Sequence, residues 1–156
     1  MTSPNIIRQQ SDSLILIKSW QDGKEEAYPI RKRVFIDEQG VPEEMELDEY
    51  DSSAQHALAY LNSECIGTAR LLTLTGSNGT VGKIGRMAVL PLYRRQGIGG
   101  KLLCALLELS KSQGITQFKL HAQLSAIPFY EQFGFIAQGD IYDEAGIAHR
   151  DMMLNI

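Results

Sequence analysis

The hydrophobic pattern in the first half of the chain predicts strands that pair in sequence. Four segments rich in aliphatic and β-branched side chains predict strands, over residues 13–20, 56–61, 65–75 and 81–90. Asp22-Gly23 follows the first of them and Asn78-Gly79 precedes the last, and both dipeptides are turn signals. We therefore expect an antiparallel meander in this half.

A leucine-rich stripe predicts the main helix of the second half. Its apolar positions recur at helical spacing, at Ile98, Leu102, Leu103, Leu106, Leu107 and Leu109. Gly114 ends the stripe, and residues 118–122 predict a strand, so the unit implies a parallel strand-helix-strand crossover. A short helix over residues 125–133 follows, and then strands over residues 135–142 and 147–154.

The segment after the first strand has a helical part and an acidic part. Ala27, Ile30 and Val34 share a helical face and predict a helix over about residues 25–36. Pro29 is expected in its first turn, or the helix starts at Pro29. Residues 37–55 predict a long irregular loop. The predicted class is α+β, with a mixed, mostly antiparallel sheet of about six or seven strands.

Length and composition predict one ordinary globular domain. The 156 residues include 44% hydrophobic and 22% charged side chains, and residues 1–156 show no linker or repeat. Residues 1–12 are mostly polar and are predicted to be poorly ordered. This start lacks the apolar core of a signal peptide, and no run reaches membrane-spanning length. We expect a cytoplasmic protein without a membrane partner.

Negative charge is concentrated in one segment. The net charge is −4, but eight of the 19 acids lie between Asp37 and Asp51, where no lysine or arginine occurs. The remaining 15 basic and 11 acidic residues suit an anionic cofactor, and the acidic segment suits a cationic amine acceptor. A solvated acidic loop without a ligand is the alternative. The sequence pI of about 5.4 and the lack of a basic stripe argue against a nucleic-acid partner.

Cysteine and histidine spacing gives no sign of a metal centre. Cys65 and Cys104 do not form a C-x-x-C motif and are expected to be reduced thiols. His56, His121 and His149 lack metal-ligand spacing. No metal is predicted.

A basic, glycine-rich bend joins an apolar strand to the leucine-rich helix. Arg94 and Arg95 precede Gly97, Gly99 and Gly100. A helix N-terminus presents backbone N–H groups without intrahelical partners and binds anions, and glycines let a phosphate approach the backbone closely. The bend therefore predicts a pyrophosphate cradle.

Residue identities in this bend exclude two other phosphate-binding loops. The pattern G-x-x-x-x-G-K-[ST] fails because Arg95 stands five residues before Gly100 and Leu102 follows Lys101. The dinucleotide pattern G-x-G-x-x-G, started at Gly97, requires a glycine where Leu102 stands. Neither a P-loop nor a dinucleotide fold is predicted.

Three ordered motifs resemble the GNAT superfamily of acetyl-CoA-dependent N-acetyltransferases. Its R-x-x-G-x-G pattern occurs at residues 94–99, and residues 86–93 and 126–135 resemble its cofactor-contacting strand and its late helix and strand. Residues 34–48 are similar to a bacterial branch called ElaA-like or YjcF-like. The resemblance covers about residues 30–154 and implies a GNAT fold with about four helices around the sheet.

The resemblance implies which residues contact acetyl-CoA, the expected cofactor. Main-chain groups of Met87, Ala88 and Val89 hold its amide arm and thioester in this interpretation. The other residues implied are Arg94, Arg95, Gln96, Gly97, Ile98, Gly99, Gly100, Lys101, Gln123, Ala126, Phe129 and Tyr130. Gln123 stands where many members carry asparagine, which leaves the geometry there open.

Acetyl transfer needs a base for the amine and a proton for the departing thiolate. Tyr130 matches the family's catalytic tyrosine, whose phenol is protonated at neutral pH and can hydrogen-bond a thiolate. Packing against neighbouring aromatic rings is its alternative role. Glu38, just after the first helix, is the predicted base. Its rivals are Asp48, Asp51, His56 and His121.

Charged side chains are predicted to form the acceptor pocket. The candidates are Glu38, Asp48, Asp51, Arg70, Arg86 and His121. Arg70 and Arg86 either pair with the acidic segment or meet an anionic part of the acceptor. For the acids a solvated position is the alternative, and for His121 a place in the core.

The sequence thus predicts an N-acetyltransferase that moves an acetyl group from acetyl-CoA to a primary amine by direct attack in a ternary complex. The acceptor is a small-molecule or peptide amine, and both a monomer and a homodimer are compatible with the sequence. An acyltransferase like the acyl-homoserine-lactone synthases and a non-catalytic CoA-binding regulatory module are the alternatives.

Overall fold

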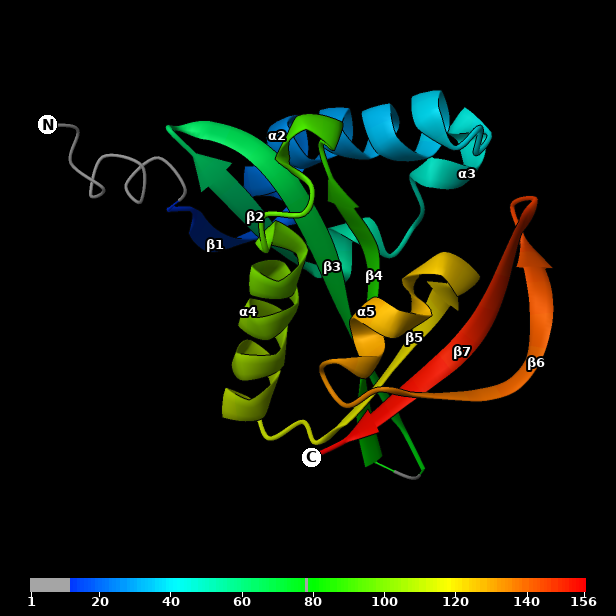
Figure 1. The fold of residues 1–156 in the computed structure, drawn as a ribbon. Coiled ribbons are helices and arrows are strands. Elements are labelled where there is room, and N and C mark those ends of the chain that lie inside the picture. The colour runs from blue at the N-terminus through cyan, green and yellow to red at the C-terminus, as the bar shows by residue number, and fades with distance from the viewer. Residues whose placement is uncertain (1–11, 78) are drawn as a thin grey trace, which may run out of the picture.

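A seven-stranded sheet of order β1-β2-β3-β4-β5-β7-β6 forms the centre of the computed structural model, which describes residues 12–77 and 79–156 (Figure 1). The strands are β1 (Leu14–Ser19), β2 (Gln55–Leu61), β3 (Glu64–Gly76), β4 (Gly79–Val89), β5 (Gln117–Gln123), β6 (Ile136–Glu144) and β7 (Ile147–Asn155). β4 and β5 are parallel, and the other neighbours are antiparallel. The predicted α+β class with a parallel crossover is confirmed.

Helices α2 (Trp20–Arg31) and α4 (Ile98–Ser112) cover opposite faces of the sheet. Side chains of β2 point alternately to the two faces of the sheet, so successive residues pack in turn against α4 and α2. Ala57 and Ala59 belong to the core formed with the leucines of α4. Leu58 packs on α2 so closely that a Cβ on Gly23 would lie 3.0 Å from its Cδ1. The predicted stripe of α4 is buried at Ile98, Leu102, Leu103, Leu106 and Leu107.

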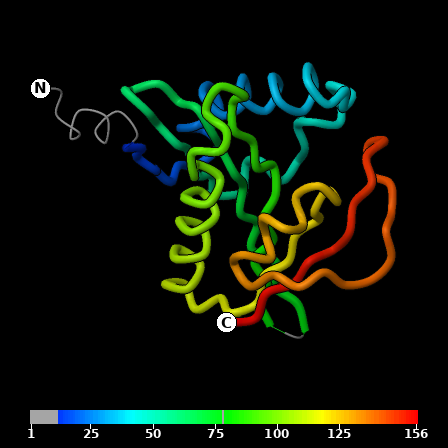
Figure 2. The backbone as a smooth tube through the Cα atoms, in the orientation of Figure 1, coloured from blue at the N-terminus to red at the C-terminus, as the bar shows by residue number. Residues whose placement is uncertain are grey.

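Strands β4 and β5 diverge and leave a split in the sheet. Their parallel pairing joins residues 81–83 to residues 117–119, and the described pairing ends at Lys83 and Lys119. Beyond that point β4 runs toward α2, whereas β5 runs toward α5 (Ile127–Glu131), and the two strands can be followed in Figure 2. The main chain of β4 therefore faces the split without a neighbouring strand on that side.

A bulge on β4 borders this split. Ala69 of β3 lies opposite two residues of β4, Arg86 and Met87. Arg86 has a φ of 49°, a left-handed conformation that is uncommon for residues other than glycine. A bulge interrupts regular pairing and changes the direction of nearby side chains. It places both residues at the edge of the split.

The first helix begins earlier than the sequence predicted. α2 begins at Trp20 because Ser19 caps it by accepting a hydrogen bond from the N–H of Asp22 at 3.2 Å. Asp22-Gly23 therefore lies inside the helix and forms no turn. Pro29 lies near the end of α2, not in its first turn, and a π-helical segment, Lys32–Glu38, follows directly.

The prediction of an irregular loop over residues 37–55 is wrong in part. This segment contains α3 (Glu43–Glu46) and a 3₁₀ turn (Asp51–Ser53). The side chains of Glu46 and Asp51 are only 2% and 3% exposed. Arg31 donates from Nε to Glu46 Oε1 at 2.6 Å and from Nη1 to Asp51 Oδ1 at 2.8 Å. Pairing of this kind lets charged groups be buried, and a count of charges along the chain does not reveal it.

The ion pairs of Arg31 extend to the sheet. Arg70 Nη1 donates to Asp48 Oδ1 at 2.7 Å and to Asp51 Oδ1 at 3.0 Å. Arg86 Nη2 donates to Asp48 Oδ2 at 3.1 Å. The charge cluster, as we call it, consists of Arg31, Glu46, Asp48, Asp51, Arg70 and Arg86. It fastens the acidic segment to α2 on one side and to β3 and β4 on the other.

Two sequence predictions concern residues outside the described part of the chain. The first prediction is that residues 1–12 are poorly ordered, and of these only Asp12 is described. The second is that Asn78 forms a turn with Gly79, and Asn78 is not described. The hairpin that this turn closes is present, because Gly76 pairs with Gly79. Of the helices in the described residues, none has the length and hydropathy needed to cross a membrane.

The charge cluster predicts a large stability loss on Asp51→Ala. Two buried guanidiniums lose a partner, and we expect the free energy of unfolding to fall by about 3 kcal/mol, measured by urea denaturation. Glu49→Gln, at an exposed position in the same segment, should change it by less than about 0.5 kcal/mol. Equal losses in the two variants would contradict this account.

The pH dependence of stability gives a second measurement on the same variant. Burial acts to raise the pKa of Asp51, but hydrogen bonds from Arg31 and Arg70 outweigh it, so its pKa lies below the ordinary value. The contribution of Asp51 is therefore complete above the unfolded pKa near 3.9 and is lost as pH falls through the folded pKa. In Asp51→Ala, the free energy of unfolding should therefore not show this decrease as the pH falls.

Candidate active site

The N-terminus of α4 forms an exposed cradle of backbone amides. Gly97 precedes the helix with a φ of 82°, and Arg95 has a φ of 64°. The first helical hydrogen bond runs from Lys101 N–H to Gly97 O at 3.1 Å, so the amides of residues 98–100 precede the regular ladder. Residues 94–97 are exposed. This cradle, residues 94–100, has the geometry and the dipole direction to bind an anion.

The two helical glycines also let the cradle pack against the aromatic rings that follow β5. A Cβ on Gly99 would lie 3.4 Å from Phe129 Cζ, and a Cβ on Gly100 would lie 3.2 Å from Phe133 Cζ. The sequence pattern predicted only a role in phosphate approach for these glycines. Their small size additionally holds the start of α4 close to α5, beside the split.

Tyr130 of α5 faces the β4 bulge. Its Oη lies 3.9 Å from Met87 Sδ, and the ring of Phe129 packs edge-on at 5.0 Å. Burial raises the pKa of Tyr130 to about 12. The phenol is therefore protonated at neutral pH and can donate a hydrogen bond at the split.

A cavity of about 580 Å³ opens at the same place. Its walls come from the acidic segment, from β3, β4 and β5, and from the β6–β7 hairpin. Eight of the predicted site residues line it: Asp48, Arg70, Arg86, Met87, His121, Gln123, Ala126 and Tyr130. The structure thus joins residues assigned to cofactor binding with residues assigned to the acceptor.

A side-chain hydrogen bond links the two sides of the split. Gln123, at the end of β5, donates from Nε2 to Oε1 of Gln39 at 3.0 Å. Gln39 follows the π-helical segment, and both residues line the cavity. The acidic segment therefore contacts β5 as well as β4 and covers the cavity between them.

Glu38 does not occur among the described residues that line this cavity. Its carboxylate accepts two hydrogen bonds from Arg94, from Nη1 to Oε2 and from Nη2 to Oε1, both at 2.7 Å. These hydrogen bonds lower the pKa of Glu38 below its ordinary value, which makes it a weaker base. The sequence analysis predicted Glu38 as base and acceptor ligand, whereas the structure places it against the cradle.

Asp51 and His56 also lie away from the described lining of the cavity. The Asp51 carboxylate is taken up by Arg31 and Arg70. His56 is 1% exposed, its Nε2 lies 3.0 Å from Asp51 O, and burial lowers its pKa. The structure therefore gives both residues a structural position and weakens their case as bases.

A histidine-carboxylate group stands on the opposite wall of the cavity. His121 Nδ1 lies 3.1 Å from Glu144 Oε1, and the other oxygen of Glu144 lies 3.6 Å from His149 Nε2. With Nδ1–H of His121 donating to Glu144, Nε2 carries the lone pair. Among the predicted bases, His121 alone combines a place in the cavity with a side chain not paired to arginine.

The remaining predicted cofactor residues follow β4 toward the cradle. Ala88 and Ile98 are buried, at 3% and 2% exposed, so their side chains are not free to contact a ligand. Val89 O accepts a hydrogen bond from Arg94 Nε at 2.9 Å. Gln96 is exposed in the bend.

Most of the residues that line the cavity were not predicted from the sequence. The missed residues include Phe35, Val41, Glu46, Leu72, Leu74, Lys83, Glu144 and His149. Leu72 and Leu74 alternate with Arg70 on β3, so the two-residue period of a strand could have found them. Glu144 and His149 had no such signal, because only the bend of the β6–β7 hairpin brings them to the cavity.

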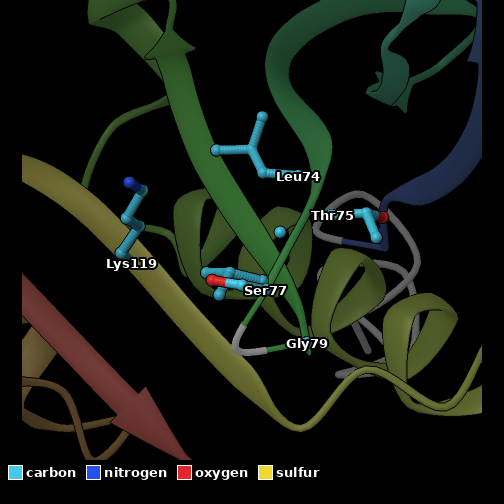
Figure 3. Close-up of a pocket in the computed structure, with 7 residues that line it drawn as sticks. Leu74, Thr75, Ser77, Gly79 and Lys119 are labelled. Carbon is cyan, nitrogen blue, oxygen red and sulfur yellow. The ribbon is translucent and has the colours of Figure 1, made fainter.

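A smaller pocket of about 270 Å³ lies at the end of the β3–β4 hairpin. Figure 3 shows Leu74 and Thr75 of the hairpin on one side and Lys119 of β5 on the other. Its lining residues include none of the predicted site residues. We therefore place the candidate active site at the larger cavity.

The described residues contain no group of three or more histidine, cysteine or acidic side chains arranged to hold a metal ion. Both cysteines are free. Burial raises the pKa of Cys65 to about 11, so its thiolate is a minor species at neutral pH.

Known proteins resemble this chain in sequence. The family model described as acetyltransferase (GNAT) domain matches residues 19–156. A Bacillus subtilis relative with a provisional acetyltransferase name is 40% identical over 126 residues, or 79% of this chain and 83% of its own. Bacillus subtilis YjcF, by name an uncharacterized N-acetyltransferase, is 35% identical over 130 residues, or 82% of this chain and 89% of its own.

Solved structures share the fold. The crystal structure of Escherichia coli ElaA matches with a TM-score of 0.80 and 26% identity, covering 91% of this chain and 99% of that one. The CoA-dependent acyl-homoserine lactone synthase BjaI matches with a TM-score of 0.76 over 93% of this chain and 84% of that one. Its identity is only 19%, so this likeness concerns the fold alone.

The left-handed conformation at Gly97 predicts a specific cost for Gly97→Ala. An added Cβ would meet no atom within 4 Å, so the cost comes from backbone strain and should be about 1 kcal/mol in urea denaturation. Gly76 has equally open space and no positive φ, so Gly76→Ala should change stability by less than about 0.5 kcal/mol. A neutral Gly97→Ala would refute the backbone geometry of the cradle.

Proposed function

The chain belongs to the acetyltransferase (GNAT) family, in its ElaA/YjcF-like branch, and on that premise we propose that it acetylates a primary amine with acetyl-CoA. Both substrates bind together in this proposal, and the acetyl group passes directly from sulfur to nitrogen. The observation that carries it is the meeting of the cradle, Tyr130 and the 580 Å³ cavity at one split in the sheet.

The cradle supports binding of the coenzyme A diphosphate. The amides of residues 98–100 and the positive end of the α4 dipole favour a doubly charged phosphate ester. Along β4, the main chain next to Met87 has no strand partner on the split side among residues 12–77 and 79–156, and it can pair with the amides of the coenzyme arm. The thioester then reaches the bulge, beside the cavity.

Tyr130 stabilises the departing thiolate by a hydrogen bond. With a pKa of about 12 it lies about 3.5 units above a thiol of pKa near 8.5, so full proton transfer would cost about 5 kcal/mol. A hydrogen bond carries no such cost. The amine nitrogen forms the new bond to carbon, the carbon–sulfur bond breaks, and the proton that the amine loses can neutralise the sulfur.

His121 is the proposed base. With Nδ1–H donating to Glu144, Nε2 carries the lone pair that accepts a proton from the amine, directly or through one water. Asp151 Oδ1 lies 3.7 Å from the same Nε2 and can stabilise the ring once it is protonated. The carboxylates of Glu46 and Asp48 in the same cavity already accept hydrogen bonds from arginines. Burial raises the pKa of Glu46, but its carboxylate is only 2% exposed and is held by Arg31, so an amine in the cavity has little access to it.

Direct transfer is favoured over an acetylated enzyme by the state of the thiols. The raised pKa of Cys65 disfavours a nucleophilic thiolate, and the Cys65 Sγ contacts Gly67 O at 3.7 Å, not a histidine. Cys104 lies on α4 outside the lining of the cavity. Neither thiol stands where the thioester and the amine would meet.

Two variants should separate binding from chemistry. Gly97→Asp places a negative charge in the cradle and should weaken coenzyme A binding at least tenfold, or about 1.4 kcal/mol, in calorimetric titration. Gly97→Ala is its control for backbone strain. Tyr130→Phe should lower kcat at least tenfold with coenzyme A affinity unchanged within about threefold.

The same assay distinguishes the proposed enzyme from the alternatives. Acetyl-CoA consumption with a panel of amines, measured by thiol release, is expected for the wild type. Tight coenzyme A binding without transfer to any amine would favour the binding module. Equal losses of coenzyme A affinity in Gly97→Asp and Tyr130→Phe would refute the division of roles.

A second pair of variants tests the base. His121→Gln should lower kcat about a hundredfold, because general base catalysis contributes roughly that much, and added imidazole should restore part of it. Glu38→Gln should keep kcat within about threefold and alter KM for acetyl-CoA, because Glu38 contacts only the cradle arginine in the site. A hundredfold loss in Glu38→Gln would restore Glu38 as the base.

A further inference from the structure

The acidic segment brings little uncompensated negative charge to the cavity. The three carboxylates of the charge cluster, Glu46, Asp48 and Asp51, face the same number of guanidiniums. The carboxylate of Glu38 is likewise held by Arg94. The cationic acceptor that the sequence favoured therefore loses its main electrostatic support.

Lys83 adds a positive charge to the cavity without forming an ion pair to any described carboxylate. It lies on β4 opposite Lys119 of β5 and lines the cavity. The described acids of the lining have other partners, because Glu46 pairs with Arg31, Asp48 pairs with Arg70, and Glu144 contacts two histidines. Burial, together with the charges of Lys119 and Arg70, lowers the pKa of Lys83. An anion beside the ammonium would reverse this destabilisation.

Arg70, which lines the same cavity, keeps one buried donor unused. The residue is 5% exposed, and its Nε has no hydrogen-bond partner in the part of the chain that the structure describes. The other end of its guanidinium, Nη1, donates to Asp48 and Asp51. A buried donor without an acceptor costs about 1–3 kcal/mol, so an oxygen placed there is stabilised.

We propose that the acceptor amine carries an anionic group, a carboxylate or a phosphate, that binds between Lys83 and Arg70. This inference rests on the proposed acetyltransferase function and names the class of its acceptor. The oxygens of such a group accept hydrogen bonds from Lys83 Nζ and, after a shift of the Arg70 side chain that opens its buried Nε to the cavity, from Arg70 Nε. Both bonds are charge-assisted and lie in a partly desolvated cavity, where such bonds are strong.

The strand geometry also constrains the acceptor length. Lys83 and Met87 are four residues apart on β4, a Cα separation of at most about 14 Å. The amine must reach the thioester at the bulge while the anionic group stays near Lys83. Several bonds therefore separate the two groups, and an ω-amino acid fits better than an α-amino acid.

Matched amines test the inference. The kcat/KM values with acetyl-CoA would be compared for 4-aminobutanoate, 6-aminohexanoate, 3-aminopropyl phosphate, glycine and the uncharged alkylamines of equal length. We expect the long anionic amines to exceed their uncharged counterparts at least tenfold. The ratio of the kcat/KM values for the amines with a carboxylate to the value for 3-aminopropyl phosphate identifies which anionic group is preferred. Equal values for charged and uncharged amines would overturn the inference.

Variants at Lys83 connect the preference to the residue. Lys83→Met should reduce the preference to about twofold by raising KM for the anionic amines, with a much smaller change in KM for the uncharged amines. Lys83→Arg should keep most of it, and Lys24→Met, at an exposed position on α2, should behave as the wild type. If a folded Lys83→Met variant kept the tenfold preference for anionic amines over uncharged amines, the inference would be overturned.

A binding measurement distinguishes failure of this inference from failure of the proposed function. Pentanoate carries the anion without an amine, and its calorimetric titration should give heat with the wild type and Lys83→Arg but not with Lys83→Met. No transfer to any amine would overturn the acetyltransferase proposal alone. Absence of Lys83-dependent heat would overturn the anionic acceptor, even where uncharged amines are acetylated.

Discussion

The buried ion pairs of Arg31 hold the wall on which the candidate active site depends. Arg31 lies at the end of α2 and binds Glu46 and Asp51, which belong to a segment with few apolar side chains of its own. Without these contacts the segment would have little reason to fold against the sheet, because its backbone and charges are better solvated in water. With them it supplies Gln39 and Asp48 to the cavity.

The split between β4 and β5 gives the site its position. Parallel pairing ends at Lys83, the bulge at Arg86 and Met87 changes the direction of β4, and α4 connects the two strands along the chain. The start of α4, the free edge of β4 and the ring of Tyr130 then meet at one opening. Backbone amides at the cradle and a neutral phenol at the bulge give a thioester site that needs few charged side chains.

Ion pairs with arginines change what the charged residues of the sequence imply about the acceptor. Eight acids in one segment suggested a surface that attracts cations, yet Glu38, Glu46, Asp48 and Asp51 each hold an arginine. The charge that remains without a described ion-pair partner in the cavity is a lysine that no motif marked. The anionic acceptor proposed here and the proposed move of the base from Glu38 to His121 both follow from this difference.

The sequence by itself determined the features that local physics controls. The strands, the leucine stripe of α4 and the glycine bend follow from side-chain periodicity and backbone freedom over a few residues, and the structure contains them. The start of α2 was missed because the Ser19 cap competes with an equally good turn signal at Asp22-Gly23. Only the tertiary structure decided which charges are paired and which side chains share the cavity. Contacts such as Arg31 with Asp51 or His121 with Glu144 join residues about 20 or more apart, and neither spacing nor composition encodes such a distance in space.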